Sequence, residues 1–172
     1  MKVKIVVFFC SLLGLLVYSG CGDDNKVLLF SIEDDKKLGA QVADQIDNDT
    51  SFVILSESEY PAAYSYLNNM KNKILNSGEV QYKNEFVWKL HIIHNDDVLN
   101  AFATPGGYIY IYTGLIKFLE REDDLAGVLG HEIAHADRRH GSKQMQQQYG
   151  LSILLGIITG GNERTISTTS IY

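Results

Sequence analysis

The feature that most constrains this chain is the pentapeptide His-Glu-Ile-Ala-His at residues 131–135. Around it, apolar residues recur at the three- and four-residue spacing of a helix that packs against a core. They are Leu125, Val128, Leu129, Ile133 and Ala136. Side chains four residues apart lie one above the other on a helix, so both imidazoles project from the same face. We therefore predict one helix over roughly 123–148, whose acidic first turn suits the positive end of the helix dipole.

Two stacked imidazoles with a carboxylate beside the first are typical of a catalytic zinc site. His131 and His135 are the predicted metal ligands, and Glu132 is the predicted catalytic base. Zinc lowers the pKa of a bound water from about 15.7 to about 7, and a neighbouring carboxylate can take the proton as that water attacks a carbonyl. The pattern therefore predicts peptide-bond hydrolysis. The alternative is a packing helix that carries two surface histidines.

Composition limits the remaining possibilities. The chain has 172 residues, of which 45% are hydrophobic, which is enough for one domain with a real core. Its formal net charge of −6 argues against a nucleic-acid partner. No internal repeat is evident.

The first twenty residues have the pattern of a lipoprotein signal peptide. Two early lysines precede an apolar run over 5–17, and the tetrapeptide Tyr-Ser-Gly-Cys ending at Cys21 resembles a bacterial lipobox. Tyr18 departs from the Leu, Val or Ile that is usual there. A membrane-spanning helix is the alternative, but the apolar run is shorter than the about 20 residues that a bilayer requires.

These residues predict lipidation of Cys21, with residues 21–30 as a polar tether to the domain that follows. The predicted location is the bacterial cell envelope, with the periplasmic side of the outer membrane favoured. Cys10 would leave with the signal peptide, so no thiol pair would remain for a disulfide.

Periodicity and turn residues predict the other elements of the domain. Helices are expected over 31–47, capped by Ser31, over 61–77 beginning at Pro61, over 113–119, and as a buried helix over 151–159. Strands are expected over 86–93 and 108–113, with residues 100–107 as a turn between them. We predict His91 and His94 as surface histidines rather than ligands.

From Asn100 to His140 the chain resembles metallopeptidase family 48. The resemblance rests on residues 100–107, on Thr113-Gly114-Leu115, on residues 124–130 before the pentapeptide, and on Arg139-His140 after it. It implies an α+β, zincin-like (gluzincin) peptidase domain, mostly helical, with a small sheet whose edge strand precedes the zinc helix. It also implies Zn²⁺ as cofactor, His131 and His135 as ligands, and Glu132 as base.

By the same resemblance, the 100–107 segment leads into an edge strand that pairs with substrate polypeptides through main-chain hydrogen bonds. The residues expected to contact substrate are Gly107, Tyr108, Ile109 and Tyr110.

A catalytic zinc has three protein ligands, and the family takes its third from a glutamate in a Glu-x-x-x-Asp setting on a later helix. That setting is absent up to Tyr172, so residues 31–172 are expected to be the N-terminal, incomplete part of the peptidase domain. Glu163 lies in a Gly-Gly-Asn-Glu-Arg stretch that favours a solvated loop. His140 is five residues past His135, about 500° of helix rotation, which would place it about 140° from the ligand face.

The resulting prediction is a membrane-anchored zinc endopeptidase that hydrolyses envelope proteins in quality control. A non-catalytic, chaperone-like or peptide-binding lipoprotein that keeps the peptidase fold is the alternative. A purely structural lipoprotein, the third possibility, would leave Glu132 between two stacked histidines as an accident of sequence.

Overall fold

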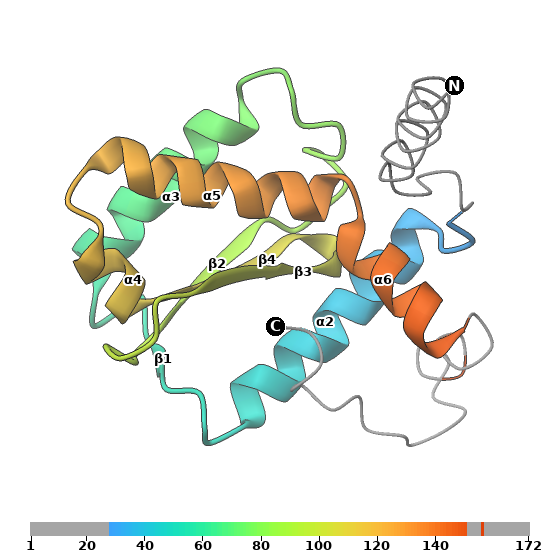
Figure 1. Cartoon of the computed structure of the whole chain (residues 1–172), viewed down its shortest axis with the longest axis horizontal. Helices are drawn as coiled ribbons and strands as arrows, with labels where there is room; N and C mark the ends of the chain where they lie inside the picture. The colour runs from blue at the N-terminus through green and yellow to red at the C-terminus, as the bar shows by residue number, and fades with distance from the viewer. Residues whose placement is uncertain (1–27, 151–155, 157–172) are drawn as a thin grey trace, which may run out of the picture.

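The computed structural model describes residues 28–150 and residue 156 (Figure 1). The predicted signal peptide, Cys21 and Glu163 lie outside the described residues, and so does the predicted helix over 151–159 apart from Gly156. Within the described part of the chain, no helix has the length and apolar character needed to cross a bilayer.

Four strands form the sheet at the centre of the fold, in the order β1-β2-β4-β3. They are β1 (Ile54–Leu55), β2 (Lys89–Ile93), β3 (Ala101–Thr104) and β4 (Tyr108–Tyr112). The pair β2 and β4 is parallel, whereas β1 and β3 run antiparallel to their neighbours at the two outer positions.

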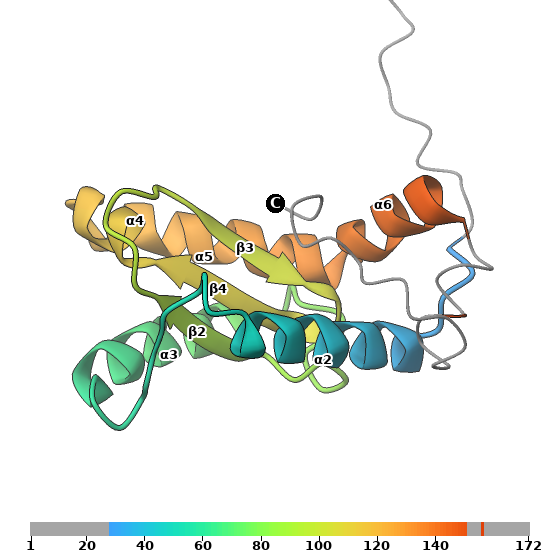
Figure 2. The ribbon, with the colours of Figure 1, turned by 90° about the horizontal axis from the view of Figure 1, so that it is seen from below.

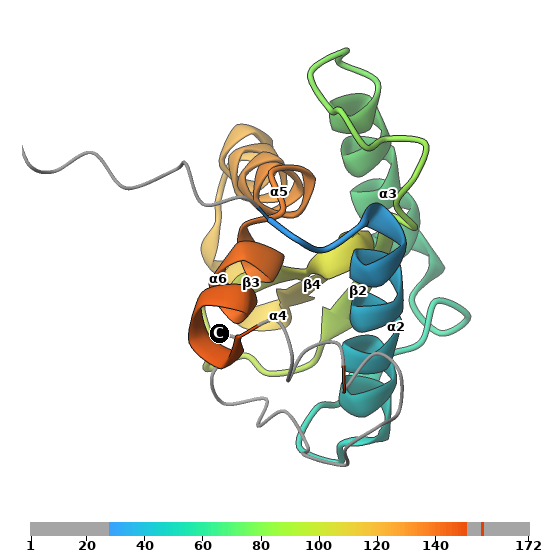
Figure 3. The same ribbon diagram turned by 90° about the vertical axis from the view of Figure 1, so that its right-hand side faces the viewer.

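Helices cover both faces of this sheet (Figures 1 and 3). On one face, α3 (Pro61–Leu75) and α5 (Glu122–Asp137) lie side by side. Their apolar stripes bury the larger core cluster against β2 and β4, with Leu129 and Ile109 fully buried. On the other face, α2 (Ile32–Asn48) packs Val42 and Ile46 against Phe102 and Tyr110. The small mixed sheet and flanking helices agree with the α+β prediction.

The helix starts predicted at Ser31, Pro61 and Thr113 are confirmed. Ser31 caps α2 through a capping box, in which its side chain accepts from the Asp34 backbone and the Asp34 carboxylate accepts from the Ser31 backbone. Pro61 opens α3, where its missing N–H costs no helical hydrogen bond. The short α4 (Thr113–Phe118) also forms as predicted.

The edge-strand prediction is wrong. Tyr108 to Tyr112 form β4, which pairs with β2 on one side and with β3 on the other, so its main-chain groups are engaged within the sheet. Residues 101–104, predicted as part of a turn, instead form β3, the outer strand beside β4. The turn is confined to the 3-10 segment η2 (Pro105–Gly107), where Gly106 and Gly107 have positive φ angles.

The prediction that His91 is a surface residue is also wrong, because it assumed that one face of β2 meets solvent. The His91 side chain is 6% exposed and stacks on Tyr110, with ring centroids 4.9 Å apart. Parallel strands are usually buried on both faces, and α2 supplies the second cover here. His94, at the strand end, is exposed as predicted.

The long helix predicted over 123–148 is broken in two. The first part, α5, ends at Asp137, and α6 (His140–Tyr149) begins after Arg138 and Arg139. Arg139 has a φ of 59° and a ψ of 34°, a left-handed conformation that a helix does not continue through. The chain therefore changes direction between α5 and α6, which the ribbon shows (Figure 2).

Candidate active site

The two histidines of the pentapeptide converge on one point. His131 and His135 project from the same face of α5, and their Nε2 atoms lie 3.0 Å apart. Two nitrogen ligands of a tetrahedral zinc, each at about 2.0–2.1 Å, would lie about 3.3 Å apart. The distance between the two nitrogens is therefore close to the distance between two ligands of one zinc ion. Among residues 28–150 and 156, no cluster of three or more His, Cys, Asp or Glu side chains is arranged to hold a metal ion.

Glu132 lies beside this pair and is half-buried against the sheet edge. Burial raises the pKa of the Glu132 carboxyl, while neighbouring His131 and a hydrogen bond from the Ala103 backbone oppose that rise. Because Ala103 belongs to β3, this bond connects the carboxylate directly to the outer strand. A carboxyl with a raised pKa is a better proton acceptor when ionised than an ordinary glutamate.

A cleft of about 400 Å³ opens in front of Glu132 and His135. One wall is the outer strand β3 and the residue before it, Asn100, and the other is α6. The α6 side chains on that wall are His140, Gln144, Met145, Gln148 and Tyr149. The cleft is therefore bordered by a strand along one side and by largely uncharged side chains along the other.

The residues predicted to contact substrate lie elsewhere. Tyr110 is fully buried in the core cluster under α2, and Ile109 is fully buried in the cluster under α5. Gly107 packs against Phe86 and Trp88. The strand that borders the cleft is β3, in which half-buried Ala101 and Ala103 alternate with buried Phe102 and Thr104.

The position of His140 also differs from the sequence-based prediction. Because α5 ends before it, His140 is not carried around the helix, and its Nδ1 lies 3.2 Å from Nδ1 of His135. The two rings meet edge to face, with centroids 4.8 Å apart and planes at 84°. The 140° separation calculated for a continuous helix is therefore wrong, since the helix is not continuous.

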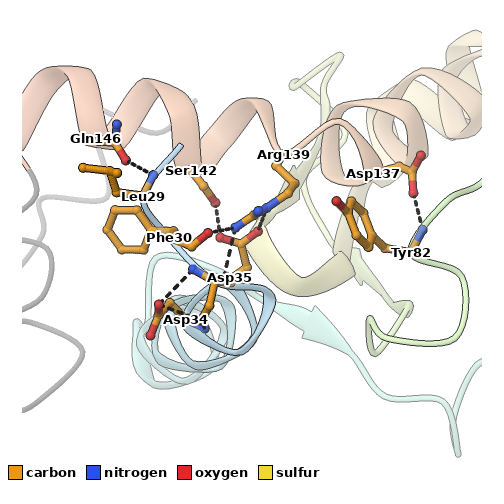
Figure 4. Close-up of polar contacts among 10 residues, drawn as sticks. Leu29, Phe30, Asp34, Asp35, Tyr82, Asp137, Arg139, Ser142 and Gln146 are labelled. Atoms are coloured by element: carbon orange, nitrogen blue, oxygen red, sulfur yellow. Dashed lines mark hydrogen bonds and ion pairs between the residues drawn. The ribbon is translucent and has the colours of Figure 1, made fainter. Parts of the chain in front are cut away.

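A buried polar cluster holds the helix break in place (Figure 4). The Arg139 guanidinium forms an ion pair with Asp35 of α2 and also donates to the main-chain oxygens of Phe30 and Ser31. The Ser142 hydroxyl donates to the second Asp35 oxygen at 2.7 Å. Asp35 is completely buried. The start of α2 is thereby attached to the start of α6.

Comparison with known proteins identifies the family of this chain. The model of peptidase family M48 matches residues 61–168, which include strands β2, β3 and β4 of the sheet, α5 and α6. This chain belongs to that family. Its relatives include the β-barrel assembly-enhancing protease of Yersinia pestis, which is 33% identical over 95 residues, or 55% of this chain and 18% of the relative.

Two other relatives are mitochondrial metalloendopeptidases named OMA1. The Schizosaccharomyces pombe protein is 41% identical over 58 residues, covering 34% of this chain and 17% of the relative. The Bos taurus protein is 29% identical over 122 residues, covering 60% of this chain and 23% of the relative. The chain thus spans about a fifth of the length of these relatives.

Proposed function

We propose that this M48 protein is a zinc-dependent endopeptidase that cleaves polypeptides at the Glu132 cleft. The observation that carries the proposal is the 3.0 Å approach of the His131 and His135 Nε2 atoms beside the half-buried Glu132 carboxyl. The two imidazoles are the proposed metal ligands. The third ligand is proposed to come from residues other than those described, and the gluzincin form of the site, with a glutamate in that role, is part of the proposal.

Zinc, when bound, supplies Lewis acidity that polarises a carbonyl group and favours attack by water. Glu132 accepts the proton of the attacking water and can return it to the leaving amine, which is the ordinary cycle of a general base. The Ala103 backbone keeps the carboxylate aimed along the β3 side of the cleft. His131 and His135 would hold the zinc ion through their Nε2 atoms.

The outer strand β3 is the proposed binding surface for substrate, in place of the β4 residues predicted from the sequence. Tyr112 donates to the Asn100 carbonyl, so residues 100, 102 and 104 direct their main-chain groups toward β4. By strand alternation, Ala101 and Ala103 direct theirs outward, along the cleft. An extended polypeptide can pair with the Ala101 N–H and carbonyl and with the Ala103 carbonyl as an added strand, while the Ala103 N–H donates to Glu132.

We further propose that lipid on Cys21 anchors the protein, with residues 21–30 as tether, on the periplasmic side of the bacterial outer membrane. Envelope quality control is the proposed role, supported by similarity to proteins named β-barrel assembly-enhancing proteases. The substrates would be incompletely folded envelope polypeptides, because strand addition requires an extended segment.

A second candidate function is a peptide-binding or chaperone-like protein without hydrolysis. It is favoured by one observation: the described residues contain two histidines at the candidate centre and no third ligand. Such a protein would use β3 and the cleft to hold a strand.

One experiment separates the two functions. The protein with its complete natural chain is incubated with an unfolded polypeptide, and cleavage is compared for wild type, Glu132→Gln and the exposed-site control Lys73→Gln. Loss of a general base lowers rates by about 10²–10⁴, so Glu132→Gln should lose cleavage while still binding the polypeptide. Equal cleavage by wild type and Glu132→Gln would refute the mechanism, and binding without cleavage in wild type would establish the second function.

A further inference from the structure

The imidazole of His135 is held at both of its nitrogens. Its Nε2 lies 3.0 Å from His131 Nε2, and its Nδ1, on the other edge of the ring, lies 3.2 Å from His140 Nδ1. The side that meets His140 is therefore not the side that meets the candidate metal position. His140 therefore contacts the proposed ligand His135 at Nδ1, the nitrogen that does not face the candidate metal position.

We propose that His140 is a positioning residue that fixes the orientation and tautomer of His135. This inference rests on the proposed zinc site. A histidine that binds a metal through Nε2 carries its proton on Nδ1, and that N–H normally donates to an acceptor that orients the ring. Nδ1 of His140 is the atom within hydrogen-bond distance, so His135 donates and His140 accepts, with the His140 proton on Nε2.

The fold places His140 there through the break between α5 and α6. In a continuous helix, a residue five positions after His135 would lie about 140° away from it. The left-handed Arg139 turns the chain so that the residue after it returns to the His135 ring. A left-handed arginine is uncommon, and here the conformation is held by the contacts of its guanidinium with Asp35, Phe30 and Ser31.

The assignment as positioning residue rather than ligand follows from the same geometry. To act as the third ligand, His140 would have to direct a ring nitrogen toward the His131 and His135 Nε2 atoms, whereas its Nδ1 faces His135 Nδ1. The edge-to-face ring contact at 4.8 Å also limits rotation of the His135 ring.

The test compares zinc affinity in protein with its complete natural chain, measured by competition with a chromophoric chelator. His140→Asn keeps an oxygen acceptor close to the position of Nδ1, and His140→Leu removes it. Partners of metal ligands contribute about 10–100-fold to affinity. We expect His140→Leu to weaken zinc binding by that factor, and His140→Asn to remain within about threefold of wild type. Gln147→Leu, on the exposed side of α6, is the matched control and should match wild type.

Two further measurements make the result specific to positioning. Thermal unfolding of the metal-free proteins shows whether a variant merely loses stability, and His140→Ala replaces the leucine variant if leucine prevents folding. Visible absorption of the Co²⁺-substituted proteins reports ligand geometry, so the band should shift in His140→Leu and not in His140→Asn.

Each outcome decides a different statement. Equal zinc affinity and equal Co²⁺ spectra in wild type and His140→Leu would overturn the positioning role alone. An Asn variant as weak as the Leu variant would overturn the acceptor assignment. A wild-type protein that binds no zinc would overturn the proposed function, and this inference with it.

Discussion

Asp35 and Arg139 form a buried ion pair although 104 residues separate them in the chain. Asp35 lies in the first turn of α2, and Arg139 is the left-handed residue between α5 and α6. The pair therefore connects the part of the domain that follows the proposed membrane tether to the helix break beside His135. Ser142 satisfies the remaining Asp35 oxygen, so the carboxylate is fully hydrogen-bonded within the protein.

Removal of one member of this pair should be strongly destabilising. Asp35→Ala leaves the Arg139 guanidinium mostly buried without its counter-ion, a change that costs about 3–5 kcal/mol in comparable pairs. Urea unfolding at neutral pH measures the loss. The matched control is Asp123→Ala, which breaks the exposed Arg121–Asp123 pair and should change the free energy of unfolding far less. Similar losses in the two variants would contradict the structural role of Asp35.

Two helical glycines should respond oppositely to alanine. At Gly39 in α2, an added Cβ would lie 1.8 Å from the Pro105 carbonyl oxygen, so Gly39→Ala requires α2 and η2 to separate. At Gly127 in α5, no atom lies within 4 Å of the added Cβ. Gly127→Ala should therefore stabilise the fold by about 1 kcal/mol, the helix-propensity difference. Thermal unfolding of both variants tests the α2–η2 contact. A Gly39→Ala variant that unfolds at the same temperature as wild type would refute this contact.

Burial of His91 predicts a pH-dependent stability. Burial lowers the pKa of His91 below the ordinary value of 6.5, with nearby Lys89 acting in the same direction and Asp47 opposing it. The unfolded chain then binds a proton more readily than the folded one as pH falls through about 6.5, so the free energy of unfolding decreases below that pH.

The variant that tests this is His91→Phe, which keeps an aromatic ring against Tyr110 and cannot be protonated. Urea unfolding at pH 7.5 and pH 5.5 should show a smaller loss on acidification for His91→Phe than for wild type. His94→Gln, at the exposed end of the same strand, is the control. The prediction fails if His91→Phe and wild type lose equal stability.

The outward main-chain groups of β3 should contribute to substrate binding. Ala101→Pro removes a donor that faces the cleft and no bond of the β3–β4 ladder. One hydrogen bond contributes about 0.5–1.5 kcal/mol, so kcat/KM for an unfolded polypeptide should fall by about 3–10-fold. Ala101→Ser keeps the N–H and should retain activity. An unchanged kcat/KM in the proline variant would exclude strand pairing at Ala101.

Local signals in the sequence were sufficient for much of the fold. The cap at Ser31, the proline at position 61 and the apolar stripe of α5 each depend on residues close together in the chain. The structure has the cap, the start of α3 and the buried face of α5 as predicted, although α5 ends earlier than expected. The pairing of His131 with His135 depends only on helical spacing, and it too is observed.

The errors came from interactions between distant segments. The sequence around Arg139 gives little sign of a break, because the nearest glycine, Gly141, lies inside α6 and the stabilising partner is the distant Asp35. The burial of His91 depends on α2 covering the second face of the sheet, and the position of β4 depends on β3 adding outside it. A short strand of four residues before a Pro-Gly-Gly turn carries too few positions for alternation to identify it.

The central claim is that His131 and His135 hold a zinc ion in the natural protein. Its most direct test is the zinc content per chain, measured by mass spectrometry of the metal, for the protein with its complete natural chain. We predict one zinc per chain in wild type and in Glu132→Gln, and close to none in the His131→Ala/His135→Ala double variant. Equal zinc contents in wild type and the double variant would contradict the account.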